Sequence, residues 1–270
     1  MDPIHRLPPI TPGLRSSGVD LWCFSHERAQ DPGLFREFAA LMTQDERARH
    51  DRLRFERDRR MFLATRALVR TVLSSYANVE PADWRFGEGE RGKPHVTGPP
   101  GVPPLYFNLS NTRGLVVCAV SGTYPEIGAD VESLDRPGGN LGVADRFFSP
   151  FEVAALRALP TEQQRTRFFR YWTLKESYIK ARGLGLALPL DRFSFLLDDG
   201  PTIRITFDPR LEDDPARWRF VQFSSSPGHL VAVGVATGGS PLSVCAAHFV
   251  PLRGVVPFEE AGTAGSVAPS

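Results

Sequence analysis

The sequence predicts an α+β protein made of a duplicated α/β unit, with one main helix packed on a three-stranded antiparallel sheet in each half. Two pairs of matching segments support this. "RMFLATRALVR" (60–70) aligns without gaps with "RYWTLKESYIK" (170–180), and "FNLSNTRGLVVCAVSG" (107–122) resembles "VQFSSSPGHLVAVGVATG" (221–238). Both matches have nearly the same offset, which indicates an internal repeat. For the helices alone, chance similarity between two amphipathic segments is the alternative.

The match between 107–122 and 221–238 predicts a β-hairpin in each half. In both segments an apolar run, a Ser-rich turn with Gly and a second apolar run follow one another. We place the halves at 18–124 and 125–252, with the junction near "SGTYPEIG" (121–128). Each half must bury the apolar face of its sheet, so we expect the halves to pack together around a ligand cleft. Segments 1–17 and 253–270 are rich in Pro, Gly, Ala and Ser, and we expect them to be disordered.

The composition is that of an ordinary globular protein, with 270 residues, 41% of them apolar, and a net charge of +1. Nothing global indicates nucleic-acid or membrane-surface binding, and apolar runs such as "LVVCAV" are too short to span a bilayer. Cys23, Cys118 and Cys245 have no CxxC spacing, which favours reduced thiols. We therefore expect a soluble cytoplasmic protein.

Two carboxylates share one face of a predicted strand in "EIGADVES". Because side chains alternate along a strand, one face carries Ile127, Ala129 and Val131, and the other carries Gly128, Asp130 and Glu132. A solvated strand face is the simpler interpretation. Paired carboxylates could instead hold Mg²⁺, which takes a few protein oxygens and completes its shell with water and phosphate.

The helix over 170–180 holds two of only three lysines, in a chain with twenty-nine arginines. Glu176 is the candidate third carboxylate, since the repeat aligns it with Arg66 and we expect the two to face each other across a pseudo-twofold axis. An ordinary surface pair between Glu176 and Lys180 is the alternative. The lysine ammonium is a compact charge that can titrate when it is buried, whereas the arginine guanidinium is planar and stays charged. A phosphate or proton-transfer site can distinguish the two, so lysines in a chain that otherwise uses arginine favour such a site.

The remaining candidates lie in turns and in an Arg-rich helix. Lys93 lies in the turn of "GEGERGKPHV", and Ser110 and Asn111 end a strand in "FNLSNTRG". Residues 45–70 hold nine arginines against five acids. A solvated helix face explains this best, although Arg47, Arg59 or Arg66 could also bind a phosphate.

These motifs, taken together, resemble a known family. "GKPHV", "FNLSNT", "IGADVE", "RFFSPFE" and "YWTLKESYIKARGLGLALPLDRFSF", in this order, are similar to the 4′-phosphopantetheinyl transferases of the surfactin-synthetase-activator type. The resemblance runs from about residue 20 to 250. It implies the fold of that family, a monomer with two pseudodimeric halves and coenzyme A between them.

The resemblance also implies a reaction. The 4′-phosphopantetheine arm of coenzyme A would move to a serine of an apo acyl or peptidyl carrier protein, as in a holo-[acyl-carrier-protein] synthase, and adenosine 3′,5′-bisphosphate would be released. It assigns Mg²⁺, or alternatively Mn²⁺, to Asp130, Glu132 and Glu176, with Glu176 and Lys180 as the catalytic pair.

The coenzyme A contacts that follow from the resemblance and from the lysine count are Lys93, Ser110, Asn111, Lys175 and Lys180, with Arg47 and Arg66 as helpers. A histidine is common in the family where Asn111 stands. Trp172 is expected to pack in the core. Two other hypotheses stay open. The first is a Mg²⁺-dependent phosphohydrolase acting on coenzyme A or a related nucleotide. The second is a non-catalytic Arg-rich nucleic-acid-binding protein, whose affinity for nucleic acid should fall steeply with salt.

Overall fold

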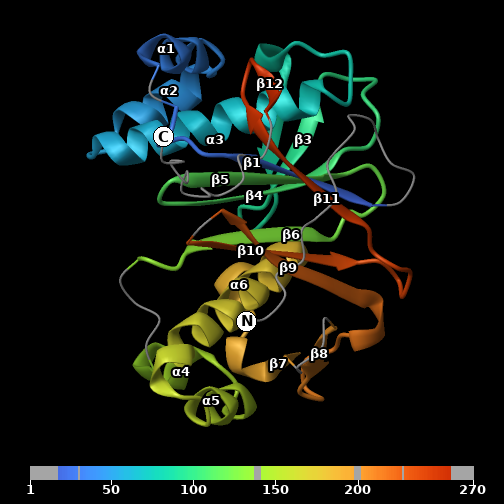
Figure 1. The fold of residues 1–270 in the computed structure, drawn as a ribbon. Helices are drawn as coiled ribbons and strands as arrows, with labels where there is room; N and C mark the ends of the chain where they lie inside the picture. Colours follow the sequence, from blue (N-terminus) through green and yellow to red (C-terminus); the bar gives the residue numbers. More distant parts are fainter. Residues whose placement is uncertain (1–17, 30, 137–140, 198–201, 227, 257–270) are drawn as a thin grey trace, which may run out of the picture.

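The computed structural model describes residues 18–29, 31–136, 141–197, 202–226 and 228–256 (Figure 1). The first half contains β1 (Val19–Phe24), α1 (Pro32–Ala40), α2 (Gln44–Asp51), α3 (Glu56–Ser74), β2 (Arg85–Glu88), β3 (Pro94–Gly98), β4 (Tyr106–Thr112) and β5 (Leu115–Ser121). The second half contains β6 (Ile127–Ser133), α4 (Leu141–Phe147), α5 (Pro150–Arg157), α6 (Thr161–Arg182), β7 (Phe193–Leu197), β8 (Ile203–Phe207), β9 (Trp218–Ser226) and β10 (His229–Ala236). Two strands follow, β11 (Val244–Val250) and β12 (Gly254–Val256).

The two halves repeat one order of elements, which confirms the predicted duplication. Each half runs from a strand through a main helix and a two-stranded hairpin to two further antiparallel strands. The three main strands are ordered β1-β5-β4 in the first half and β6-β10-β9 in the second. Helices α3 and α6 contain the two aligned helical segments, and the hairpins β4–β5 and β9–β10 contain the two aligned strand segments.

The last two strands do not belong to the half that the sequence suggested. Strand β11 pairs in parallel with β1, Val19 lying opposite Val244, and β12 pairs with β11. The first sheet therefore has five strands, in the order β12-β11-β1-β5-β4. The predicted half 125–252 is wrong at this end, and the predicted disordered tail 253–270 begins with an ordered strand; residues 1–17 and 257–270 lie outside the described part.

The elements form four layers, with α3 above the first sheet and α6 below the second (Figure 1). Three apolar cores join these layers. One lies between α3 and the first sheet and contains Leu68, Trp22 and Cys118. The second lies between the two sheets, where Val117 and Val131 are buried, and the third packs α6 on the second sheet.

Helix α6 lies directly on β6 because β6 carries a glycine at the contact. A Cβ atom on Gly128 would lie 2.0 Å from the carbonyl oxygen of Ser177 and 2.4 Å from the amide of Ala181. The helix ends at Gly183, which adopts the left-handed conformation (φ 64°) that favours glycine. Within the described ranges, no helix is long and apolar enough to cross a lipid bilayer.

Candidate functional site

Strand β6 presents two buried carboxylates to α6, as its alternating sequence predicts. Ile127, Ala129 and Val131 lie in the core between the sheets. Asp130 and Glu132 project from the other face and are only 5% and 6% exposed. The alternation predicted for "EIGADVES" is therefore confirmed, and the alternative of a solvated strand face is wrong.

Helix α6 places a matching row of side chains along this strand. Trp172, Glu176 and Lys180 are spaced four residues apart, so they share one face of the helix. Nζ of Lys180 lies 2.6 Å from Oδ1 of Asp130, and the nearby Trp172 side chain lowers the pKa of Glu132, opposing the effect of burial. The helix and the strand thus meet through polar contacts as well as through the Gly128 contact.

Ser110 of β4 completes this cluster from the first half. Its hydroxyl donates to Oδ1 of Asp130 at 2.9 Å and accepts from Nζ of Lys180 at 2.8 Å. The amide of Val131 also donates to this hydroxyl. The site therefore includes residues from both halves of the chain.

Negative charge exceeds positive charge around Asp130. Burial, and then the Asp130 charge, raise the pKa of Glu132 to about 7. The same two causes, in the same order, raise the pKa of Glu176 above its ordinary value. Arg136 lies 3.1 Å from Glu132 and offsets part of this charge. An arrangement of this kind stabilises an added cation.

The donor set fits a hard metal ion. Oδ2 of Asp130 is buried and has no hydrogen-bond partner among the described residues. Carboxylate oxygens are the ligands that Mg²⁺ prefers. In the described part of the chain, however, no three His, Cys, Asp or Glu side chains already converge as a metal centre; Lys180 lies on Asp130 instead.

Lys175 is not part of this site, so its predicted phosphate contact is wrong. It is 1% exposed, and its Nζ lies 2.8 Å from Oε2 of Glu152, which is fully buried. It also donates to the carbonyls of Leu190 and Phe193 at 2.7 Å each. Burial lowers the pKa of Lys175, and the Glu152 charge opposes this change. Lys175 therefore anchors the interior of the second half.

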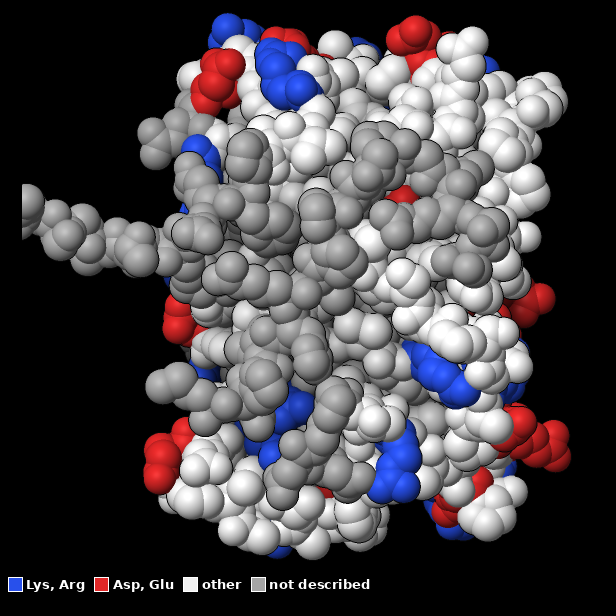
Figure 2. Space-filling view, turned by 45° about the vertical axis from the view of Figure 1, so that its right-hand side comes forward, with Lys and Arg blue, Asp and Glu red and all other residues white. Residues whose placement is uncertain are grey.

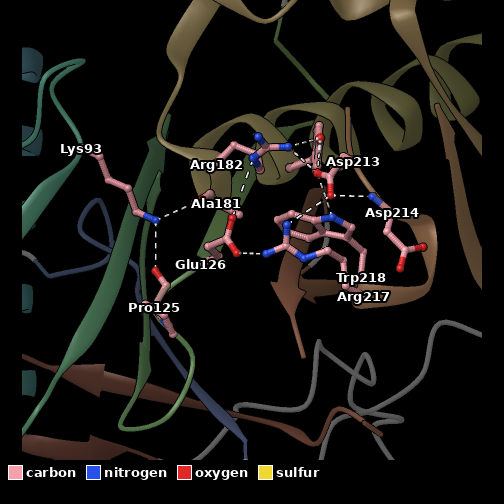
Figure 3. A network of polar contacts seen from close by, with 10 residues as sticks. Lys93, Pro125, Glu126, Ala181, Arg182, Asp213, Asp214, Arg217 and Trp218 are labelled. Carbon is pink, nitrogen blue, oxygen red and sulfur yellow. Dashed lines mark hydrogen bonds and ion pairs between the residues drawn. The ribbon is translucent and has the colours of Figure 1, made fainter. Parts of the chain in front are cut away.

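Lys93 reaches from the β2–β3 hairpin of the first half to the end of α6 (Figure 3). Its Nζ donates to the carbonyl of Ala181 at 2.8 Å and to that of Pro125 at 3.4 Å. Burial lowers the pKa of Lys93 to about 8, and the nearby charge of Glu126 opposes this shift. Beside it lies a cavity of about 300 Å³, which residues of both halves line, among them Lys93, Tyr106 and Gly183.

Comparison with known proteins identifies the family of this chain. Residues 126–236 match the model of the 4′-phosphopantetheinyl transferase superfamily, and residues 31–123 match that of the 4′-phosphopantetheinyl transferase N-terminal region. The 4′-phosphopantetheinyl transferase HetI of Nostoc sp. is 37% identical over 238 residues, covering 87% of this chain and 95% of that protein. The chain belongs to the 4′-phosphopantetheinyl transferase superfamily.

Its two-domain organisation is that of the Sfp type. The 4′-phosphopantetheinyl transferase Sfp of Bacillus subtilis is 32% identical over 211 residues, which cover 78% of this transferase and 84% of Sfp. A second 4′-phosphopantetheinyl transferase from Bacillus subtilis is 38% identical over 162 residues, or 60% of this chain and 69% of that one. The resemblance predicted from the motifs is thereby confirmed.

The three predicted arginines of the transferase lie elsewhere. Arg66 pairs with Glu46 at 3.7 Å, and its other charged neighbours are Arg49, Arg70 and Glu88. It therefore does not face Glu176, whose charged neighbours are Asp130, Lys180 and Arg136.

The other candidates of the first half lie at the surface or in local contacts. Arg47 is exposed and donates to the carbonyl of Met42. Arg59 pairs with Glu56 and the carbonyl of Leu53. Asn111 is exposed on β4, one residue after Ser110.

The sequence did not indicate the roles of three side chains in this transferase, which are Trp172, Arg136 and Asp213. Trp172 stacks on Phe168 as predicted for a core residue, but its side chain also acts on Glu132, whose pKa it lowers. Arg136 follows β6 in a bend, where no periodicity marks it.

Asp213, also outside a regular element, has a fully buried carboxylate that accepts from Tyr178 and Trp218 and pairs with Arg182 and Arg217 (Figure 3). Arg217 also pairs with Glu126, so the network holds the end of α6 beside Lys93.

Proposed function

We propose that this transferase moves the 4′-phosphopantetheine arm of coenzyme A to the hydroxyl of a serine in an apo acyl or peptidyl carrier protein. The observation that carries the proposal is the contact of Lys180 and Ser110 with Asp130, beside Glu132 and Glu176, where the two halves meet. Family membership gives the reaction, and this cluster supplies the charges that a diphosphate substrate requires.

Asp130, Glu132 and Glu176 would hold Mg²⁺, or alternatively Mn²⁺. That ion would supply charge neutralisation to the diphosphate of coenzyme A. Lys180 would hold a non-bridging oxygen of the phosphate that is attacked. Its present contact with Asp130 keeps the ammonium at the site before the substrate arrives.

In the proposed step, the serine oxygen of the carrier forms a bond to the phosphorus next to pantetheine. The bond from this phosphorus to the bridging oxygen breaks, and adenosine 3′,5′-bisphosphate leaves with the bond electrons. The serine proton passes to the Glu176 carboxylate. Burial and Asp130 raise the pKa of that carboxylate, which makes it a stronger base than an ordinary glutamate.

The nucleotide end of coenzyme A would lie along β4 toward Lys93 and its cavity. Lys93, Ser110 and Asn111 are the side chains we assign to its phosphates, while Lys175 is excluded by its burial. We also propose a cytoplasmic monomer, for which the three buried free cysteines are a supporting observation.

Incubation with coenzyme A, Mg²⁺ and a panel of apo carrier proteins tests the proposal. Intact-mass measurement should show an addition of roughly 340 Da to a carrier, the mass of the phosphopantetheine arm. Hydrolysis of coenzyme A without a carrier would favour the phosphohydrolase alternative. Figure 2 shows Lys, Arg, Asp and Glu interspersed over the described part of one face, which does not favour the nucleic-acid alternative.

Lys180→Arg should lower kcat by roughly a hundredfold with little change in Tm, because a planar guanidinium displaces the reacting phosphate by about 1 Å. Steady-state kinetics of carrier modification at saturating coenzyme A measure this effect. Arg57→Lys exchanges the same two residue types on α3, where the side chain is 81% exposed, and controls for the chemical change. Wild-type kcat in Lys180→Arg would contradict the assignment of Lys180.

The kcat/KM for coenzyme A should fall as pH rises through about 8, the pKa to which burial lowers Lys93. Below this pH the ammonium is charged and binds phosphate, and above it the amine is neutral and does not. Because kcat/KM reports groups of the free enzyme, the loss should be close to tenfold per pH unit. In Lys93→Arg, which stays charged, the fall should disappear; identical profiles for the two proteins would remove Lys93 from the coenzyme A site.

A further inference from the structure

The edge strands of the two sheets are joined by side chains. Strands β4 and β6 belong to different sheets, yet three side chains of β4 accept hydrogen bonds from backbone amides of β6. The bonds are Ala129 N to Asn108 Oδ1 at 2.9 Å, Val131 N to Ser110 Oγ at 3.3 Å, and Ser133 N to Thr112 Oγ1 at 3.4 Å. Each step advances two residues along both strands, so the bonds form a regular row.

This row explains the alternation in "FNLSNT". Phe107 and Leu109 point into the core beneath α3, and the alternate residues Asn108, Ser110 and Thr112 point to β6. Asn108, Ser110 and Thr112 are 4%, 5% and 9% exposed. A buried amide without a partner is unfavourable, so these side chains supply the partners that a neighbouring strand would otherwise give.

The bonded amides alternate with the two carboxylate residues of the site. Ala129 and Val131 flank Asp130, and Val131 and Ser133 flank Glu132. The backbone on both sides of each carboxylate is therefore held by the first half. Ser110 also contacts Asp130 and Lys180 directly. Asn108 and Thr112 instead accept hydrogen bonds from the backbone of β6.

We propose that Asn108 and Thr112 are positioning residues for Asp130 and Glu132, which set the spacing of the two carboxylates for a divalent metal. The inference rests on the metal role under "Proposed function". Partners that orient metal ligands typically change metal affinity by 10- to 100-fold when they are removed. The effect on coenzyme A binding should be small, because neither side chain reaches the Lys93 cavity.

The test compares Thr112→Val, which removes the acceptor at nearly constant shape, with Thr112→Ser, which retains it. Electron paramagnetic resonance of free Mn²⁺ gives the Mn²⁺ dissociation constant of each protein, alone and with coenzyme A. Thr112→Val should raise this constant about tenfold and lower kcat at limiting metal, with KM for coenzyme A unchanged. Thr112→Ser should restore the wild-type constant.

Thr71→Val is the matched control, since Thr71 is also buried (6% exposed) but donates within α3. It should leave the Mn²⁺ constant unchanged. If Thr112→Val does not fold, Asn108→Ala is measured in its place. A constant within about twofold of wild type in the folded variant overturns the positioning role. Absence of Mn²⁺ binding to the wild-type protein, with and without coenzyme A, instead refutes the metal assignment itself and the positioning role with it.

Discussion

Replacing Asp130 with asparagine is expected to lower kcat by at least about a hundredfold while the protein stays folded. Asparagine has nearly the same shape and keeps an oxygen for the hydroxyl of Ser110, which lies 2.9 Å away. Asparagine lacks the negative charge that pairs with Lys180. It also lacks the second carboxylate oxygen, Oδ2, which has no hydrogen-bond partner among the described residues. Carrier modification followed by intact mass gives kcat, and thermal melting monitors the fold.

The Asp130→Asn variant should also change the pH dependence of stability, through the pKa of Glu132. Burial and then the Asp130 charge raise this pKa to about 7, so the folded protein holds a proton that the unfolded chain releases at lower pH. The contribution of Glu132 to stability therefore falls as pH rises from about 4.5 to 7. In Asp130→Asn that fall should be smaller, and urea unfolding at several pH values measures it.

Asp145→Asn is the control for this change, because Asp145 is 45% exposed and pairs with Arg157 at the surface. It should keep wild-type kcat. Retention of wild-type kcat by Asp130→Asn would contradict the assignment of Asp130 to the reaction. An unchanged pH dependence of stability would contradict the coupling between the two carboxylates.

Replacing Lys175 with methionine is expected to destabilise the protein by about 3–5 kcal/mol. The change leaves the Glu152 carboxylate, which is fully buried, without the ammonium now 2.8 Å from it. It also removes the donor from the carbonyls of Leu190 and Phe193. Urea denaturation at pH 7 gives the free energy of unfolding.

Arg157→Met provides the comparison at an exposed ion pair, where the loss should stay below about 1 kcal/mol. The double variant Lys175→Met with Glu152→Gln should recover part of the lost stability, because the uncompensated charge is then gone. A stable Lys175→Met protein with a raised KM for coenzyme A would instead restore the phosphate role that the lysine count suggested.

Helical periodicity explains which lysine lies beside Glu176. Residues four apart share a helix face, so Glu176 and Lys180 are neighbours, as their spacing predicts. Adjacent residues point about 100° apart, since a turn holds 3.6 residues, and Lys175 therefore leaves the face of Glu176 and pairs with Glu152 instead. The pattern shows which residues share a face but not which face meets the site.

The alternating strand and the repeat could be predicted because each segment carries its own pattern of residues, whatever its partner in space. Asp213 and Arg136 lie outside regular elements, where spacing carries no information about direction. Strand β11 has no counterpart in the repeat, and pairing with a distant strand leaves no mark on its own sequence. These residues therefore had to be located in three dimensions.

The parallel pairing of β1 with β11 has a consequence for how the protein is made. All six residues of β1 are buried, and without β11 this strand would lie at the edge of its sheet as an apolar template for other chains. Residues 19 and 244 are paired although more than two hundred positions separate them, so ribosomes must synthesise most of the chain before the first sheet can close. Premature termination before β11 would therefore leave one edge of β1 unpaired and open to aggregation.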